Sequence, residues 1–528
     1  MTPESRPGSI PGASNPDELK GGLGLTFVDL EEVKPEAEAL ALVPPEFALK
    51  NQILPLKLEG GALVCAIGGP SSLAALDDLG ILIDRPIRPV QADPALIKDR
   101  IEQRFLSGML AELPSDAEQQ FEGKDTEDLA DLAKMAGDAA VVQMVNLMFA
   151  QAVRDGVSDI HIEPYEKDVK VRYRVDGILH EALTPPRRMH AALISRLKIL
   201  GEMNIAERRL PQDGRIKITI AGRTIDVRVS ILPTVHGERA VMRILDKGTA
   251  AIGLPELGMR PDTLEIWRKL ISVPYGMILV TGPTGSGKST TLYAALQEVY
   301  SPARNILTIE DPVEYQLKGV GQIQVRSSIG LTFASGLRSI VRQDPDVIMV
   351  GEIRDHETAE IAIHAALTGH LVFSTLHTND ASSAITRLLD MGVEPYLAAS
   401  SIVGVLAQRL IRKNCPFCRI PVEPTSESLA ALGIGPDEAK LANFMQGQGC
   451  EKCGGTGYKG RQGVYELLVV DEPVRRMTVD RSPASMIKDH ALSAQNMRTL
   501  MGDGRLAVLE GITTADDVLR VCQREDFS

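Results

Sequence analysis

A glycine-rich stretch in the middle of the chain has the residue types and the spacing of a phosphate-binding loop. Gly282, Gly287, Lys288 and Ser289 fit the pattern G-x-x-x-x-G-K-[ST]. The glycines let successive backbone N–H groups point at phosphate oxygens, the lysine can reach the outer phosphates, and the serine hydroxyl can bind Mg²⁺. We therefore expect the phosphates of a nucleotide to bind against nine consecutive residues: Gly282, Pro283, Thr284, Gly285, Ser286, Gly287, Lys288, Ser289 and Thr290.

The segments on either side of this loop are the ones that a phosphate loop requires. The apolar run 277–280 predicts a buried strand that leads into the loop, and 290–299 predicts a helix with one apolar face. A helix that begins at the loop directs the positive end of its dipole at a bound phosphate. With both segments present, the pattern favours a nucleotide site over a chance glycine loop.

Two further apolar runs end in acidic residues. Glu310 follows the run 305–309, and Gly351 and Glu352 follow the run 347–350. Because the carboxyl ends of strands line the ligand crevice of an open α/β sheet, we expect both glutamates near the γ-phosphate. One could polarise the attacking water and the other could hold Mg²⁺ through water. The sequence leaves the assignment open, since Gly351 stands where a magnesium-holding aspartate is usual.

One histidine and six arginines complete the candidate side chains of the nucleotide site. His370 and His377 flank the apolar run 371–374, and a histidine at that strand end, His377, could sense the γ-phosphate or serve a structural role. Phosphoryl transfer also requires cations where negative charge develops. The arginines in flanking positions are Arg228, Arg243, Arg338, Arg342, Arg354 and Arg387.

Two cysteine pairs have the spacing of a zinc site. A two-residue spacing lets a tight turn direct two thiolates at one tetrahedral ion. Zinc would be structural here, since four thiolates leave no open coordination position, and a redox dithiol is the alternative. The insert 419–449 exceeds the usual length of about 15–20 residues, so we expect it to extend as an arm. The four predicted ligands are Cys415, Cys418, Cys450 and Cys453.

Composition limits the classes of function. The chain has 528 residues, a net charge of −13 and an aromatic fraction of 4%, which disfavours a nucleic-acid binder with a basic surface and stacking aromatics. Residues 1–20 are polar and rich in Pro, Gly and Ser, without the apolar core of a signal peptide. No run of 18 apolar residues occurs, so we expect no membrane-spanning helix.

Changes in composition divide the chain into several parts. Gly60 and Gly61 between two strand-like runs predict a hairpin, 139–155 predicts an amphipathic helix, and alternation at 170–175 and 224–229 predicts strands. The expected parts are a disordered tail (1–20), an N-terminal docking domain (21–105), a linker (106–138), an α+β domain (139–247), and a nucleotide domain (248–528) that includes a tetracysteine zinc subdomain (413–458).

These motifs occur together in the order found in the secretion ATPases. ILTIEDPVE, RQDPDVIMVGEIRD and TGHLVFSTLHTND follow the phosphate loop, and SDIHIEP, YRVDG, RRLPQDGRI and HGERAVMRILDK precede it. From about residue 139 to 470 the chain thus resembles the secretion and type IV pilus ATPase superfamily. HGERAVMRILDK and the two CxxC pairs favour the type II secretion assembly ATPases, with the type IV pilus extension ATPases as the alternative.

The resemblance implies an α/β fold in which a PAS-like α+β domain precedes a RecA-like P-loop ATPase domain. It implies a protein-secreting, translocase-class ATP hydrolase that powers pseudopilus assembly and export, with ATP, Mg²⁺ and Zn²⁺ as cofactors. Lys288, Glu310, Glu352, Arg228 and Arg243 would be catalytic, and the other arginines would line the site or the subunit seam of a homo-hexamer.

The resemblance also implies partners and a location. The N-terminal domain would dock on the cytoplasmic domain of an inner-membrane platform protein, and a polytopic platform protein would be a further partner. The protein would be cytoplasmic, attached peripherally to the inner membrane through these partners, and would bind no nucleic acid. Two other functions share the nucleotide domain: a nucleic-acid motor, and an adaptor that binds ATP but scarcely hydrolyses it.

Overall fold

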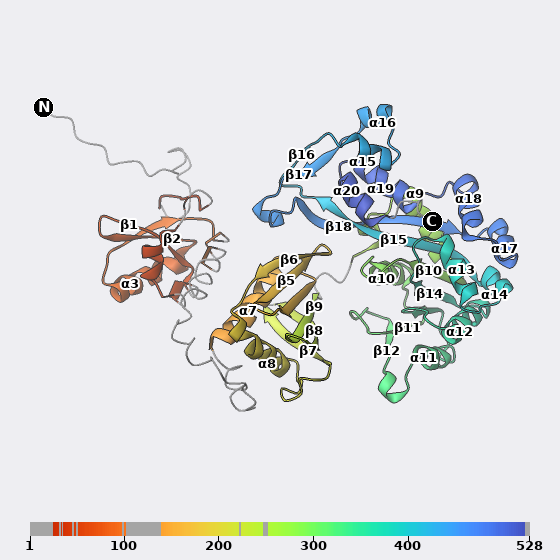
Figure 1. The fold of residues 1–528 in the computed structure, drawn as a ribbon, viewed down its shortest axis with the longest axis horizontal. Coiled ribbons are helices and arrows are strands. Elements are labelled where there is room, and N and C mark those ends of the chain that lie inside the picture. The colour runs from red at the N-terminus through yellow and green to blue at the C-terminus, as the bar shows by residue number, and fades with distance from the viewer. Residues whose placement is uncertain are drawn as a thin grey trace. The chain divides into compact units, whose positions relative to one another are not determined.

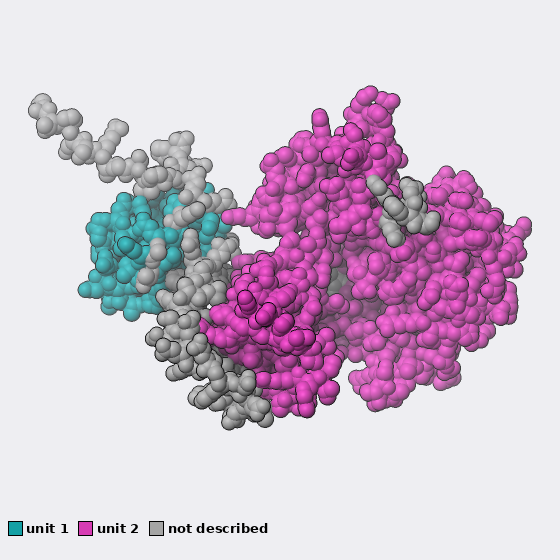
Figure 2. All heavy atoms as spheres, in the orientation of Figure 1, with its two compact units in different colours: residues 1–127 teal, residues 128–528 magenta. Residues whose placement is uncertain are grey.

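The computed structural model describes residues 25–101, 139–220, 223–246 and 252–522, apart from positions 31, 32, 34, 45, 46, 49, 50, 95, 98 and 99. The chain forms two compact units, residues 1–127 and 128–528 (Figure 2). The predicted tail (1–20) and linker (106–138) lie outside the described residues.

The first unit is built on a three-stranded sheet in the order β1-β2-β3 (Figure 1). β1 and β2 form an antiparallel hairpin, and Gly60 and Gly61 between them adopt φ angles of 61° and 86°, which side chains rarely tolerate. The predicted hairpin is therefore confirmed. β3 runs parallel to β2, and α3 makes the crossover. The bounds are α1 (Ala37–Ala41), β1 (Ile53–Glu59), β2 (Ala62–Ile67), α3 (Pro70–Ile83) and β3 (Ile87–Gln91).

Residues 139–246 of the second unit form an antiparallel six-stranded sheet in the order β6-β5-β4-β9-β8-β7. In β5 the side chains of Val169, Val171 and Tyr173 are buried and alternate with more exposed ones, so one face of the sheet is covered. Tyr173 donates a hydrogen bond to Met148 O on α7, 3.1 Å away. The bounds are α7 (Ala139–Arg154), β4 (Asp159–Pro164), β5 (Val169–Val175), β6 (Ile178–Leu183), η3 (Arg187–Met189), α8 (His190–Leu200), β7 (Gln212–Ile220), β8 (Arg223–Thr234) and β9 (Gly237–Asp246).

The described residues from 252 onward form the nucleotide domain around a seven-stranded sheet in the order β12-β11-β13-β14-β10-β15-β18. Neighbouring strands are parallel except for β18, which pairs antiparallel with β15 at one edge. The bounds are β10 (Gly276–Thr281), β11 (Ile306–Glu310), β12 (Gly321–Gln324), β13 (Val347–Val350), β14 (Leu371–Leu376), β15 (Ile402–Asn414) and β18 (Tyr458–Val469).

Helices cover both faces of this sheet, which explains the unbroken apolar runs in its sequence. On β10, Met277 and Leu279 belong to the core on one face, and Ile278 and Val280 to the core on the other. η5, α9 and α10 pack in the second core, α11–α14 and α17–α20 pack in the first, and η6 has no buried residue. The helices are η5 (Leu254–Leu257), α9 (Pro261–Ile271), α10 (Lys288–Val299), η6 (Ser327–Ile329), α11 (Phe333–Ile340), α12 (His356–Leu367), α13 (Ser382–Asp390), α14 (Pro395–Ser401), α17 (Glu472–Val479), α18 (Ala484–Ala494), α19 (Leu500–Leu509) and α20 (Ala515–Val521).

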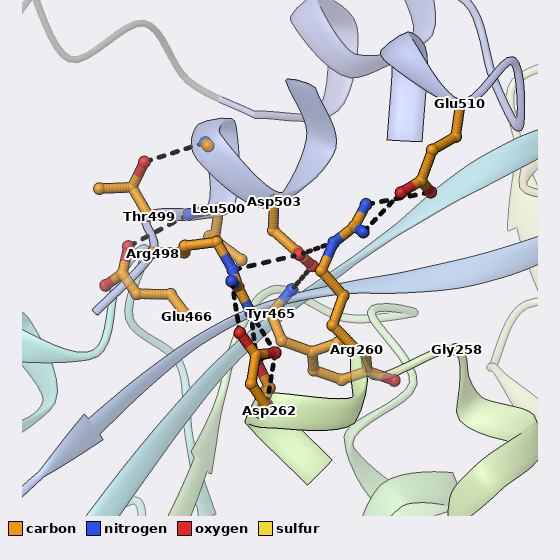
Figure 3. Close-up of polar contacts among 12 residues, drawn as sticks. Gly258, Arg260, Asp262, Tyr465, Glu466, Arg498, Thr499, Leu500, Asp503 and Glu510 are labelled. Atoms are coloured by element: carbon orange, nitrogen blue, oxygen red, sulfur yellow. Dashed lines mark hydrogen bonds and ion pairs between the residues drawn. The ribbon is translucent and has the colours of Figure 1, made fainter. Parts of the chain in front are cut away.

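A charged network joins the beginning of the nucleotide domain to its C-terminal helices (Figure 3). The buried carboxylate of Asp503 on α19 accepts hydrogen bonds from Arg260 Nε and from the backbone N–H of Tyr465 on β18, both at 2.9 Å. Arg498 binds Asp262 at the start of α9 through two nitrogens. The network therefore holds the two ends of the domain together at β18. Among the described residues, no helix is long and apolar enough to cross a bilayer.

Candidate functional site

The phosphate loop lies between the fully buried strand β10 and the start of α10. Gly282 and Gly287 adopt φ angles of 147° and 90°, and a Cβ atom on either would lie within 3.0 Å of Gln408 on β15. Glycine is therefore required at both positions by backbone conformation and by space. The Ser286 hydroxyl is buried without a hydrogen-bond partner among the described residues, and Ser289 is exposed in the first turn of α10. This arrangement fits a polyphosphate with Mg²⁺.

Lys288 is held over the loop. Its ammonium group donates hydrogen bonds to Gly282 O at 2.8 Å and to Pro283 O at 3.0 Å. Burial lowers the pKa of Lys288 to about 8, the charge of Glu352 acts in the opposite direction, and that of Arg409 lowers the pKa further. Lys288 is thus a buried cation whose charge is easily lost and which an anionic ligand would stabilise.

The two candidate glutamates lie in different environments. Glu310 at the end of β11 is buried, and its carboxylate accepts hydrogen bonds from Tyr293 on α10, from Thr308 Oγ1 at 2.5 Å and from Gln322 Nε2 at 3.0 Å. Burial and the charge of Glu310 raise the pKa of Tyr293 far above its usual value, so this hydroxyl remains a donor. The carboxylate of Glu310 is therefore bound within the protein by three donors.

Glu352 lies among the cations of the site. Its carboxylate forms an ion pair with Arg354 at 2.6 Å and lies 3.4 Å from His377 Nε2, and its charge acts on Lys288. His377 comes directly after β14, and nearly half of its side chain is exposed. His370, by contrast, approaches the backbone carbonyl of Ala365 and lies at the other end of β14. The structure thus brings together Lys288, Glu352, Arg354 and His377.

Arg228 and Arg243 belong to a row of arginines on adjacent strands. Arg215 on β7 is opposite Arg228 on β8, which is opposite Arg243 on β9. Arg228 donates a hydrogen bond to Val313 O at 2.6 Å and forms an ion pair with Glu314 at 3.1 Å, just beyond Glu310 in the sequence. Burial lowers the pKa of Arg228, and the charges of Arg215 and Arg243 act in the same direction.

The remaining predicted arginines do not contact the loop or either glutamate. Arg243 forms an ion pair with Asp159 at 3.0 Å, and Arg338 pairs with Glu357. Arg342 and Arg387 are exposed near the ends of α11 and α13. In the described part of the chain, no hydrogen bond or ion pair joins these four arginines to Lys288, Glu310 or Glu352.

Sequence reasoning missed residues on β15 and after β14. Gln408 accepts a hydrogen bond from Thr291 Oγ1 at 2.7 Å, and Arg409 donates one to Asn379 O at 2.9 Å. The Thr281 and Thr378 hydroxyls are 2.7 Å apart. The apolar run 402–407 is a signal that could have revealed the pair on β15. It leads into Gln408 and Arg409, as the other strands lead into their site residues.

The four predicted metal ligands converge on one point. All four sulfur atoms lie within 4.8 Å of one another, and three Sγ–Sγ distances are 3.7, 3.9 and 3.9 Å. A tetrahedral Zn²⁺ with Zn–S bonds of about 2.3 Å separates its sulfur ligands by about 3.8 Å, so the cluster fits zinc. The backbone N–H groups of Cys450 and Gly457 point at Cys453 Sγ at 3.1 and 3.3 Å, as a thiolate requires.

The insert between the cysteine pairs does not extend as the predicted arm. Its apolar residues Leu432 and Ile434 are buried in the larger core of the nucleotide domain. Asn443 N donates to Leu509 O at 2.8 Å, and Arg505 pairs with Glu438. The prediction was wrong because it did not consider these apolar residues. Burying their side chains against the domain is more favourable in free energy than leaving them exposed to water. The bounds are β16 (Arg419–Pro421), α15 (Ser426–Ala431), α16 (Pro436–Leu441), β17 (Met445–Gly447) and η7 (Glu451–Cys453).

The parallel sheet, the phosphate loop and the acids at the strand ends define a P-loop nucleotide-binding protein. A family model described as "Type II/IV secretion system protein" matches residues 134–520, and one described as the MshEN domain matches residues 23–109. The chain belongs to the type II/IV secretion system protein family. The predicted fold class, an α/β nucleotide domain preceded by α+β domains and carrying a tetracysteine insertion, is confirmed.

Individual relatives come from two branches of this family. The type IV pilus assembly ATPase PilB of Myxococcus xanthus is 42% identical over 97% of this chain and 91% of its own length. The type II secretion system ATPase E of Vibrio cholerae is 44% identical over 86% of this chain and 90% of its own length. The crystal structure of the ATPase DotB of Legionella pneumophila has the same fold, with a TM-score of 0.52 and 22% identity over 71% of this chain and 94% of that chain.

Proposed function

We propose that this protein hydrolyses ATP to power pseudopilus assembly and protein export by a type II secretion system. The observation that carries the proposal is the group formed by the phosphate loop, Lys288, Glu352 and His377, on a chain that belongs to the secretion family. Purified full-length protein should release phosphate from ATP steadily, and Lys288→Ala should abolish this with the fold intact. Equal turnover in wild type and Lys288→Ala would refute the assignment of the site.

In the proposed mechanism the phosphates of ATP bind against Gly282–Thr290. Lys288 would neutralise the β- and γ-phosphates, and the Ser289 hydroxyl would hold Mg²⁺, which would supply further positive charge for the transferred group. We assign the orientation of the attacking water to Glu352, because its carboxylate acts on Lys288 and, within the described part of the chain, is paired only with Arg354 and His377. His377 is then suited to respond to the γ-phosphate.

Glu310 has a different part in this proposal. Its carboxylate links β11 to α10 through Tyr293 and so fixes the helix that begins at the loop. Water-mediated contact of Glu310 with Mg²⁺ remains compatible with this role. Steady turnover that is lost in Glu352→Gln would also exclude the adaptor that binds ATP without hydrolysing it.

Further cations are proposed to reach the transferred phosphoryl group by movement between the two parts of the second unit. Arg228 is held by Val313 O and Glu314, beside the acidic segment, and Arg243 lies next to it. Rotation of residues 139–247 against the nucleotide domain would bring both toward ATP. Arg338, Arg342 and Arg387 are proposed to line the seam between subunits of a homo-hexamer.

The remaining parts have proposed structural and docking roles. Residues 413–458 would bind a structural Zn²⁺ through Cys415, Cys418, Cys450 and Cys453. Residues 21–105 would dock on the cytoplasmic domain of an inner-membrane platform protein, with a polytopic platform protein as a further partner and no nucleic acid. The protein would then be cytoplasmic and peripherally bound. Deletion of residues 1–105 should leave ATP hydrolysis intact and abolish sedimentation with membranes.

The alternative function is extension of type IV pili. It is favoured by one observation: the pilus ATPase of Myxococcus xanthus aligns with 97% of this chain, including the first unit. Replacing the chromosomal gene with Lys288→Ala distinguishes the two functions. Loss of protein export with surface pili retained supports type II secretion, whereas loss of pili with export retained supports pilus extension. Retention of both would refute both functions.

A further inference from the structure

The segment 378–381, which follows His377 directly, is held by side chains from three strands. Thr378 N donates a hydrogen bond to Thr281 Oγ1 at the end of β10, at 2.9 Å. Asn379 O accepts one from Arg409 on β15, also at 2.9 Å, and Ala381 N donates one to Glu466 on β18 at 2.8 Å. Arg409 thus binds the backbone carbonyl of Asn379, and Glu466 binds the backbone amide of Ala381, two residues later.

Arg409 connects this segment to the phosphate loop. In the register of the sheet Thr281 is opposite Ala407, so Arg409 lies beside the first residues of the loop. Its two terminal nitrogens donate in different directions, Nη1 to Gln408 O at 3.1 Å and Nη2 to Asn379 O. A Cβ atom on Gly282 would lie 3.1 Å from Nη1. The guanidinium group is therefore fixed against the loop and segment 378–381 at once.

Arg409 is a buried cation without a direct counter-ion. Only 8% of its surface is exposed, and no carboxylate of the described residues forms an ion pair with it. Burial lowers its pKa, and the charges of Cys522, Glu466 and Asp380 act from a distance in the opposite direction. Burying an unpaired guanidinium is costly, so a hydrophobic side chain would stabilise this position better if packing were its only role.

Glu466 on β18 holds the same segment through Ala381, and Figure 3 shows its carboxylate beside Leu500. It is 1% exposed and is opposite Ala407 in the register of β15 and β18. One carboxylate oxygen accepts from Ala381 N, and the other accepts from Leu500 N at 3.3 Å. Burial raises the pKa of Glu466 to about 7. Both oxygens are occupied by backbone amides, so this carboxylate joins segment 378–381 to the start of α19.

We propose that Arg409 and Glu466 are positioning residues for ATP hydrolysis, which hold segment 378–381 so that His377 stays in place beside Glu352 and the phosphate loop. The inference rests on the proposed function. His377 is 3.4 Å from Glu352, and Thr378 is bonded to Thr281 at the start of the loop. Movement of the segment would therefore displace the groups around the γ-phosphate, while the loop amides that bind nucleotide would keep their shape.

The test compares turnover with nucleotide affinity in four variants of the full-length protein. Arg409→Met removes the charge, and Arg409→Lys keeps it but cannot donate in two fixed directions as the planar guanidinium does. Glu466→Gln replaces one carboxylate oxygen with an NH₂ group, so one of the two backbone amides, Ala381 N or Leu500 N, loses its acceptor. Arg412→Met is the matched control, since Arg412 is also on β15 but pairs with Asp517, away from the loop. Each variant is assayed for kcat, for the Kd of ADP and for its thermal midpoint.

We expect both Arg409 variants to lose roughly 10- to 100-fold in kcat, the range that a displacement of about 1 Å produces, with the Kd of ADP changed less than about threefold. Glu466→Gln should lose roughly 3- to 10-fold in kcat, again with little change in Kd. Arg412→Met should keep kcat within about threefold of wild type below its melting temperature.

Three results would overturn the inference: wild-type kcat in Arg409→Lys, a rise in Kd as large as the fall in kcat, or an equal fall in kcat in Arg412→Met. Should the Arg409 variants not fold, wild-type kcat in Glu466→Gln would overturn it alone. Absence of hydrolysis by the wild-type protein in the same assay would instead refute the proposed function.

Discussion

The low pKa of Lys288 predicts that nucleotide affinity falls at alkaline pH. An exposed lysine with a pKa of 10.5 would stay almost fully charged at about pH 9, but burial lowers that of Lys288 to about 8. If only the charged form binds the phosphates well, the competent fraction is roughly 90% at about pH 7 and roughly 10% at about pH 9. The association constant of ADP should therefore be nearly full at about pH 7, fall to about half at about pH 8 and fall about tenfold by about pH 9.

The assay is isothermal titration of the full-length protein with ADP between about pH 7.5 and pH 9.5, a range in which the terminal phosphate of ADP, with a second pKa of about 6, is almost fully ionised. Lys288→Arg is the control, since a guanidinium stays charged throughout and its weaker binding should not vary with pH. Glu352→Gln should move the fall to lower pH, because the carboxylate raises the pKa of Lys288. Constant affinity of the wild type up to about pH 9.5 would refute the reasoning.

Other predictions concern the acids, the metal and the arginines. Glu352→Gln should lower kcat by about 100-fold or more, measured by phosphate release. Glu310→Gln should mainly lower the free energy of unfolding, by about 1–3 kcal/mol, because its amide would face a hydrogen-bond donor, and denaturant melts measure this change. The reverse pattern would contradict the roles assigned to the two glutamates. Cys415→Ser should reduce bound zinc from about one ion per chain to nearly none, measured by elemental analysis, and should lower the thermal midpoint, measured by calorimetry. Absence of zinc from the purified wild-type protein would refute the zinc site. Arg228→Ala and Arg243→Ala should cut turnover by roughly 10- to 1000-fold with much smaller loss of nucleotide binding, and full activity in both would rule out their proposed role.

Much of the candidate site could be predicted from local patterns. The phosphate loop is continuous in sequence, and its glycines, lysine and serine each have a role that follows from residue type. Apolar runs that end in Glu310 and Glu352 indicated strands that meet at one edge, and the structure has both as neighbouring parallel strands. The cysteine spacing likewise indicated a shared metal site, because two CxxC turns are short enough to present thiolates without knowledge of the fold.

Distant packing could not be predicted in this way. Arg409 is 121 positions after Lys288, and only the parallel pairing of β15 with β10 brings it beside the loop. The apolar run 402–407 indicated a strand that leads to Arg409, but it did not indicate that the guanidinium group is buried beside the loop, whereas Arg342 and Arg387 are exposed. The insert 419–449 was predicted to extend because only its length was considered. In the structure its residues Leu432 and Ile434 pack into the core of the nucleotide domain, which its length did not indicate.

The sequence by itself determined that this chain has a phosphate loop, two acids after buried strands and a tetracysteine site, because each depends on residue type and short-range spacing. Only the tertiary structure decided which environment, and so which proposed role, each of the two acids has. Glu310 and Glu352 have the same side chain and both follow a buried strand, Glu310 as the last residue of β11 and Glu352 two residues after β13. Tyr293, Thr308 and Gln322 surround the first with hydrogen-bond donors, whereas the second pairs with Arg354 and lies beside the ring of His377. Thr308 and Arg354 are close in sequence to their carboxylates, but Tyr293, Gln322 and His377 are not, and they reach the two glutamates only when the sheet and its helices pack.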